Sequence, residues 1–430
     1  MNHISGGVSM KKTISVFLFL VLAGALVFAG GSKAASDGAS GGQTVTIFHH
    51  MGEQAKRDAL QAWCDEAHRR NPQYNYEVTV ISDANEYRSI IRTKIAAGDP
   101  ADIMFGAIRD YPDLAEAGHI ADITNMPYIK NYDPEILKGS VINGKIYGIP
   151  VDMGLIMVFY NKDIFAKYNL SVPKTYAEFL QICKTLQSNN INPLALGFKD
   201  AWTAGVDFMM EWYMLLYKNP DFFRDIHNGN KKFADSPEFR RAMERSRERF
   251  AMATGNPFGT DNDQSIQMFA SGRAAMLPNG TWSISTVRDL TPNGNFGLFP
   301  LPADKEADTA ARLFTDDCFM VSSHTTKMDA ITALFNFATS SDGANLWAEK
   351  SMCTPAVKGV TLNKPDSMLA DAAAQVKSGK TIFADTDFEP TGQPFEVFFG
   401  SFSPGFLADQ SKSIDQWIAQ LDIDYAAALK

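Results

Sequence analysis

An alternation of short apolar strands and amphipathic helices constrains how this chain can fold. Residues 44–50 (TVTIFHH), 76–81 (YEVTVI) and 102–106 (DIMFG) have the composition of strands. The segments between them, 54–70 and 86–97, carry apolar side chains at helical spacing. Strand and helix in alternation predict a parallel sheet with right-handed crossovers, which places the chain in the α/β class.

Ligands of such sheets bind beyond the carboxyl ends of the strands. In this chain those positions are residues 49–53 (HHMGE) and 106–109 (GAIR), which makes His50 and Arg109 candidate binding residues. A solvated loop is the alternative for Arg109. His49 and His50 are adjacent rather than four residues apart on a helix, so the pair does not indicate a metal site.

A second α/β unit is predicted after Val151. Helical periodicity continues through the following 120 or so residues, and a strand at 273–278 leads into Gly280-Thr281-Trp282. The segment that enters this unit, residues 143–165, is apolar for most of its length and yet carries Asp152 two residues after Pro150. The helices predicted here are 176–188, 202–217, 237–253 and 263–272.

Composition excludes several classes of function. The chain is 45% hydrophobic with a formal charge of −9, and it has no run of basic residues. Nucleic acid and anionic membranes are therefore not expected partners. The four cysteines match no zinc or redox spacing, and free buried thiols are favoured over a disulfide between Cys318 and Cys353.

The chain also lacks the common catalytic motifs. It contains no G-x-S-x-G, H-E-x-x-H, G-x-x-x-x-G-K-[ST] or G-x-G-x-x-G sequence. Asp316 and Asp317 are adjacent, and adjacent residues of a strand point to opposite faces, so they would not form a catalytic pair. We therefore expect no enzyme, no cofactor and no metal.

The N-terminus has the pattern of a secretory signal. Met10-Lys11-Lys12 precedes an apolar stretch at 14–28 and a run of small residues. We expect a signal peptide over 1–34, a flexible leader over 35–43 and a periplasmic or extracellular protein; an uncleaved membrane anchor is the alternative. The cleavage region contains no cysteine that could be lipidated.

The order of several local signatures resembles the extracellular solute-binding proteins of ABC importers, in the branch that carries sugars and oligosaccharides. Each signature is weak alone, but their order and spacing extend over almost the whole exported chain. Asp316-Asp317 departs from the small residues that many relatives have there, and the lipidation cysteine is missing. The matching segments are AAGDPADI (96–103), GKIYGIP (144–150), YNKD (160–163), VPKTYAEF (172–179), FASGRAAM (269–276) and GTW (280–282).

The resemblance implies a two-lobe periplasmic-binding-protein fold, with hinge-crossing segments and a ligand cleft between the lobes. We assign residues 44–152 with 319–357 to the first lobe and 153–318 with 358–430 to the second. It further implies a monomeric receptor that captures a sugar or oligosaccharide by hinge closure and delivers it to the transmembrane subunits of an ABC permease.

Sugar chemistry then selects candidate contacts in that cleft. Pyranose rings stack on aromatic side chains, so Trp282 and Trp202 are candidate platforms, with ordinary core packing as the alternative. Asp152 could accept two hydroxyl hydrogen bonds, and Asp316 is a further candidate. The alternative for Asp152 is bonding to backbone amides across the hinge, and for Asp316 it is a hinge role shared with Asp317. Phe395 could close the cleft, although Phe in this segment is more often core. A receptor for a polyamine or a phosphorylated compound, and less so an exported glycoside hydrolase, remain alternative functions.

Overall fold

The computed structural model describes residues 42–429 except 82, 316–317, 363–364 and 384–394. Residues 42–430 form one compact unit. The predicted signal peptide and nearly all of the predicted leader lie outside the described residues. Within the described residues, none of the helices has the length and apolar character needed to cross a membrane.

The first sheet has five strands in the order β2-β1-β3-β12-β6. Strand β1 runs parallel to β2 and β3, which confirms the predicted parallel arrangement. Strand β12 returns from far along the chain and pairs antiparallel with both β3 and β6. The strands span Tyr74–Val80 (β2), Gln43–His49 (β1), Ile103–Gly106 (β3), Cys318–Val321 (β12) and Ile149–Pro150 (β6).

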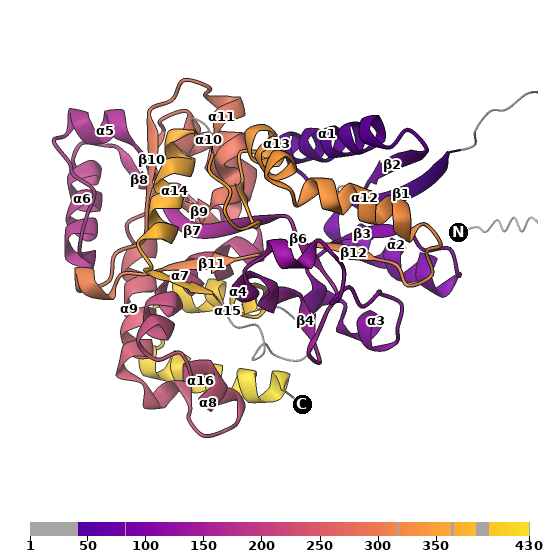
Figure 1. The fold of residues 1–430 in the computed structure, drawn as a ribbon. Coiled ribbons are helices and arrows are strands. Elements are labelled where there is room, and N and C mark those ends of the chain that lie inside the picture. The colour runs from indigo at the N-terminus through magenta and orange to yellow at the C-terminus, as the bar shows by residue number, and fades with distance from the viewer. Residues whose placement is uncertain (1–41, 82, 316–317, 363–364, 384–394, 430) are drawn as a thin grey trace, which may run out of the picture. The chain divides into compact units, whose positions relative to one another are not determined.

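Helices cover both faces of this sheet because the side chains of each strand alternate between two clusters of buried residues. Ile103 and Phe105 pack into the cluster beneath α1, α12 and α13, whereas Met104 packs with α2 and α3. Figure 1 shows α1 and α13 at the top of this part of the molecule and α12 below them, level with β1. These helices span Gln54–Arg70 (α1), Met328–Ala338 (α12), Ser341–Ser351 (α13), Ala84–Ala96 (α2) and Pro112–Glu116 (α3).

The second sheet is built around the long strand β7, Asp152–Asn161. Its path is β14-β11-β7-β9-β8, and β10 and β13 also pair with β7. Strand β7 is antiparallel to β9, β10, β11 and β13, so this sheet is mixed rather than parallel. The other strands span Thr381–Phe383 (β14), Ala311–Phe314 (β11), Ala274–Gly280 (β9), Asn192–Leu194 (β8), Phe296–Phe299 (β10) and Thr354–Pro355 (β13).

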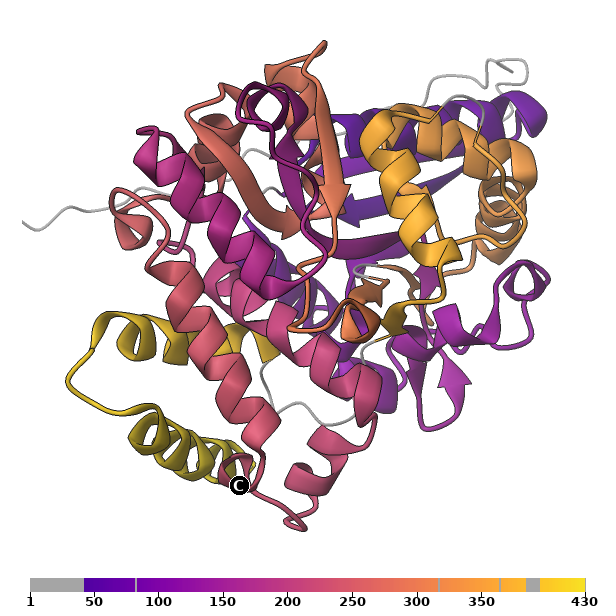
Figure 2. The same ribbon diagram turned by 90° about the vertical axis from the view of Figure 1, so that its left-hand side faces the viewer.

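Side chains along β7 also alternate between two clusters of buried residues, one on each face of the second sheet. Leu155 and Met157 face the cluster under α10, α11 and α14, whereas Ile156 and Val158 face the cluster under α6, α7, α9, α15 and α16. Figure 2 views the molecule from the side of α6 and α9, with α16 at the lower left. The helices span Asn262–Ala270 (α10), Ile284–Leu290 (α11), Ser367–Lys377 (α14), Tyr176–Ser188 (α6), Ala201–Lys218 (α7), Pro237–Phe250 (α9), Phe395–Ala408 (α15) and Ile414–Ala428 (α16).

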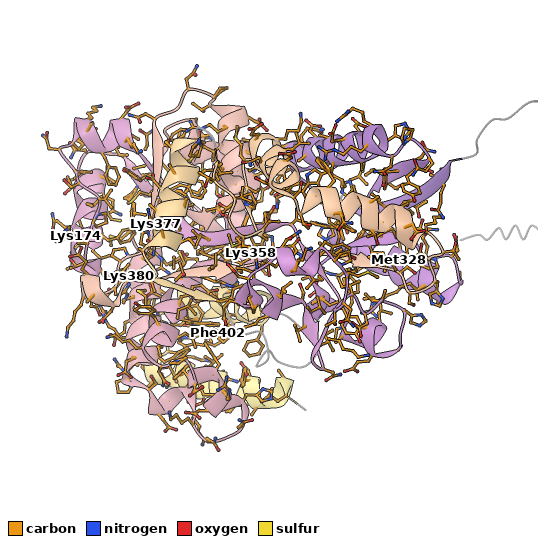
Figure 3. All side chains as sticks on the ribbon, in the orientation of Figure 1. Lys174, Met328, Lys358, Lys377, Lys380 and Phe402 are labelled. Atoms are coloured by element: carbon orange, nitrogen blue, oxygen red, sulfur yellow. The ribbon has the colours of Figure 1, made fainter. Side chains whose placement is uncertain are left out.

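The C-terminal helices complete this second layer with aromatic side chains. Phe402 of α15, labelled in Figure 3, stacks on Phe406 with ring centroids 5.8 Å apart and meets Trp417 of α16 edge-on at 5.6 Å. Trp63, Trp212, Trp347 and Trp417, which lie on apolar helix faces, are all buried. The four cysteines are free and buried, which confirms the favoured interpretation.

Two short elements bear on the predicted lobes. Strand β6 of the first sheet ends at Pro150, and strand β7 of the second sheet begins at Asp152. The chain therefore passes from one sheet to the other at Val151, next to the predicted boundary at residue 152. Strand β13, which was assigned to the first lobe, pairs with β7 of the second sheet. The lobe boundaries therefore stay a prediction.

Candidate functional site

A pocket of about 310 Å³ opens between elements of the two sheets. One wall comes from the loop after β1, the first turn of α1 and the end of β3. The other comes from β7, α7, α10, β11 and the turn after β9. The lining residues are His50, Met51, Gly52, Glu53, Lys56, Phe105, Ile156, Trp202, Val206, Asn262, Trp282, Arg312 and Phe314.

The first wall is a loop fixed from both ends. Arg57 donates hydrogen bonds to the carbonyl oxygens of Met51 and Gly52, at 2.9 and 2.5 Å. The Met51 amide donates to Nδ1 of the buried His49 at 3.2 Å. Glu53 caps α1, and Lys56 follows in its first turn. The loop thus presents a carboxylate and an ammonium group to the pocket from rigid backbone.

His50 lies against aromatic rings in this wall. Its imidazole meets Tyr87 edge-on at 4.8 Å and Phe105 at 5.7 Å between ring centroids. Burial, followed by the positive charge of Arg88, lowers the pKa of His50. Burial also lowers the pKa of the neighbouring His49 to about 4, with the charges of His50 and Arg57 adding to the effect. At neutral pH, both rings are therefore held in the neutral form.

The second wall is aromatic, and two glycines make room for its rings. A Cβ atom on Gly280 would lie 1.9 Å from the indole of Trp282, and one on Gly154 would lie 2.2 Å from the ring of Phe314. Trp282 meets Trp202 with ring centroids 6.0 Å apart and meets Phe314 edge-on at 5.7 Å. Any side chain larger than hydrogen at either glycine would displace a ring of this wall.

A polar contact fixes the start of two helices at the pocket. The carboxylate of Asp200, just before α7, accepts a hydrogen bond from the backbone N–H of Asn262 at 2.8 Å. The Oδ1 atom of Asn262 in turn accepts from Nδ2 of the buried Asn279 at 3.1 Å. Trp202 and Asn262 are thereby held next to each other at the opening of α7 and α10.

Two cations line the pocket with different surroundings. The ammonium group of Lys56 lies 3.5 Å from Oδ2 of Asp152, and the same oxygen accepts from Nε1 of Trp347 at 3.2 Å. The guanidinium of Arg312 lies over the rings of Phe314 and Tyr213, at 4.9 and 5.6 Å from their centroids.

The structure brings three of the seven predicted residues, Trp282, Trp202 and His50, into this pocket. Asp152 is buried and does not belong to the described lining; it meets the pocket through Lys56. Its carboxylate contacts the side chains of Lys56 and Trp347, from two helices, whereas the alternative considered from sequence was bonding to backbone amides across the hinge. The remaining three residues cannot be placed as site residues: Asp316 lies outside the described residues, as do the side chains of Arg109, in the 3-10 turn Ile108–Asp110, and of Phe395 in α15.

Sequence reasoning missed Lys56, Arg312, Asn262 and Phe314. Helical periodicity placed Lys56 on a predicted helix but gave no reason to single it out. Arg312 and Phe314 belong to the strand Ala311–Phe314, which no motif marks. A charged residue within an apolar strand, as in ARLF, is the one signal that could have identified Arg312.

Comparisons with known proteins agree with these features. The model of the family "Bacterial extracellular solute-binding protein" matches residues 53–345, which is more than half of the 430-residue chain. The chain is 21% identical to the multiple sugar-binding protein of Streptococcus mutans over 333 residues, covering 74% of this chain and 77% of that protein. It is 24% identical to the melibiose/raffinose/stachyose-binding protein MelE of Bacillus subtilis over 314 residues, covering 70% of both.

Solved structures show the same two-lobe α/β fold. The apo form of RafE from Streptococcus pneumoniae has a TM-score of 0.73 at 20% identity, over 92% of this chain and all of that chain (100%). A chitin oligosaccharide binding protein has a TM-score of 0.75 at 20% identity, over 90% of this chain and 99% of that chain.

Proposed function

Because the chain belongs to the bacterial extracellular solute-binding protein family, we propose that it is the substrate-binding receptor of an ABC importer and that its ligand is a sugar or oligosaccharide bound in the pocket described above. The names of relatives such as the multiple sugar-binding protein and MelE support a saccharide as the ligand class.

The observation that carries the proposal is that one pocket combines aromatic rings with polar side chains. Trp202, Trp282 and Phe314 supply rings on which the C–H faces of a pyranose can stack. The polar groups that can bond to its equatorial hydroxyls are His50, Glu53, Lys56, Asn262 and Arg312.

Capture proceeds by closure of the pocket. Because its walls come from elements of both sheets, a ligand that touches both walls binds a closed arrangement better than an open one. The closed receptor then delivers the ligand to the transmembrane subunits of the permease. Export by the N-terminal signal, a periplasmic or extracellular location and a monomeric state belong to the same proposal.

The charge of the pocket argues against the polyamine alternative. A polyamine needs several carboxylates, but Glu53 is the only acidic side chain among the described residues that line the pocket, where it accompanies Lys56 and Arg312. The hydrolase alternative needs two carboxyl groups facing the scissile bond, and the described lining supplies one.

A ligand screen tests the proposal. We expect saccharides to raise the melting temperature of the exported protein, polyamines to leave it unchanged, and the bound saccharide to be recovered unaltered after long incubation. Small-angle scattering at saturating saccharide should show compaction. The receptor function is contradicted if no saccharide binds, and the binding-only role is contradicted if the saccharide is cleaved.

A further inference from the structure

Arg312 is a buried cation that has no counter-charge among the described residues. The residue is 5% exposed, lies on β11 and lines the pocket. Among the described residues no carboxylate forms an ion pair with it, and its buried Nε atom has no hydrogen-bond acceptor. The guanidinium forms cation–π contacts with the rings of Phe314 and Tyr213.

Other buried arginines of the chain show what a compensated guanidinium looks like here. Arg249 is fully buried and forms ion pairs with Asp207 and Glu211. Arg245 is 4% exposed and forms an ion pair with Glu211 at 2.8 Å. Arg312 differs from both: it has the burial of a paired arginine without a described anion beside it.

Lys56, the other cation that lines the pocket, does have a counter-charge within the protein. Lys56 has Asp152 within 3.5 Å, so its charge is balanced inside the protein. Glu53 is the one carboxylate of the described lining. Of the two cations that line the pocket, Arg312 is therefore the one without a carboxylate beside it among the described residues.

The rings around Arg312 define how it can bind. An arginine stacked on aromatic faces keeps its N–H groups in the guanidinium plane, where they can donate two parallel hydrogen bonds to a carboxylate. Phe314 is itself held over Gly154 and against Trp282. The guanidinium thus lies against Phe314, which in turn contacts the proposed stacking platform Trp282.

Resting on the proposed function, we propose that the natural ligand is an acidic saccharide and that Arg312 binds the carboxylate of a uronate residue. A sugar hydroxyl can accept a hydrogen bond from Arg312 but does not balance its buried positive charge. A carboxylate accepts hydrogen bonds and also supplies the negative charge. A phosphate would bring a second negative charge towards Glu53, so a single carboxylate fits the described lining better.

Matched ligands test this without any substitution. Short oligogalacturonates and glucuronate-substituted xylo-oligosaccharides are compared with their own methyl esters by calorimetry. We expect at least one acid to bind about tenfold or more tightly than its ester, with an affinity that falls as salt is added. Phosphorylated sugars and free galacturonate form further arms that distinguish other anions from an oligosaccharide uronate.

Substitutions then assign the effect to Arg312. Arg312→Gln should weaken binding of the acid about tenfold or more while changing that of the ester by less than about threefold. Arg312→Lys keeps the charge and should retain part of the preference. Arg273→Gln, at an exposed arginine just before β9, is the matched control. If Arg312 served only the fold, Arg312→Gln would lower the melting temperature of the ligand-free protein. If Arg312 binds the ligand, we expect the melting temperature of ligand-free Arg312→Gln to be unchanged or higher.

The outcomes separate the two proposals. Esters or neutral saccharides that bind as tightly as the acids would overturn the acidic ligand and leave the saccharide receptor intact. Tighter binding of a phosphorylated sugar would overturn the carboxylate, and equal loss of acid and ester in Arg312→Gln would overturn the role of Arg312. If no saccharide of any charge binds, the proposed function itself fails.

Discussion

The ammonium nitrogen of Lys56 lies 3.5 Å from Oδ2 of Asp152, and both side chains are about 10% exposed. This pair joins the first turn of α1 to the first residue of β7, and Trp347 of α13 donates to the same oxygen at 3.2 Å. A single carboxylate therefore connects three elements at the base of the pocket, and it fixes the position of a lysine that lines the pocket.

Asp152→Asn is expected to destabilise the protein through Lys56. The amide keeps an acceptor for Trp347 but removes the negative charge 3.5 Å from the buried ammonium of Lys56, which costs about 3 kcal/mol of unfolding free energy. Chemical denaturation measures it. The double variant Asp152→Asn/Lys56→Met should recover part of the loss, because the unpaired charge is gone. Normal stability with a large loss of affinity would instead assign Asp152 a direct contact with the ligand.

Trp282→Ala is expected to weaken saccharide binding by roughly ten- to a hundredfold, because it removes the stacking platform. Affinity and melting temperature are measured together, since loss of the ring could also disturb Trp202 and Phe314. Trp417→Phe, remote from the pocket lining, is the control for tryptophan fluorescence, and the ligand-induced fluorescence change should shrink in Trp282→Ala only. Full affinity in the folded fraction of Trp282→Ala would make Trp202 the first candidate platform.

Arg249→Met is expected to lower the free energy of unfolding by about 3 kcal/mol, because it leaves the buried carboxylate of Asp207 unpaired and removes one of the two arginine partners of Glu211, which keeps Arg245. Urea unfolding gives the value. Arg240→Met on the same helix α9 is the matched control, since Arg240 pairs with Glu244 and Asp415 at the surface, and we expect it to change stability little. Similar losses in both variants would show that helix α9, rather than the buried ion pairs, is sensitive to the substitution.

The stability of the protein should fall as the pH drops from about 6.5 to about 4, in part because of His49. Burial lowers the pKa of His49 from 6.5 to about 4, so in this interval the unfolded chain binds a proton that the folded chain excludes. The loss attributable to this residue reaches roughly 3 kcal/mol at pH 4 and is absent above pH 6.5. Proton uptake at Nδ1 would also displace the hydrogen bond from the Met51 amide.

Unfolding free energies measured across this interval test the role of His49. His49→Asn offers an oxygen to the Met51 amide without a titrating ring, so its stability should depend less steeply on pH. His68→Asn, at an exposed histidine of α1, is the matched control. Identical pH dependence in the parent protein and in His49→Asn would contradict the assignment to His49.

Much of the fold could be predicted because local periodicity records which side chains are buried. Helices α1 and α6 have the predicted bounds, and β1, β2 and β3 lie within two residues of theirs. The second sheet was less predictable, because the antiparallel pairing of β7 with four strands depends on segments up to about 200 residues away. No periodicity within a segment reports such a partner.

The sequence by itself determined the elements, the α/β class and the positions beyond the strand ends where His50 lies, because each follows from residues close together in the chain. Only the tertiary structure decided what Asp152 and Arg312 do. In the sequence, Asp152 and Arg312 have the same character, because each is a charged residue within an apolar segment. Burial of either charge is costly unless a partner compensates it. Folding brings Lys56 and Trp347 to Asp152, whereas among the described residues it brings Arg312 aromatic rings and no anion. Long-range packing therefore decides which buried charge is balanced within the protein and which one faces the pocket.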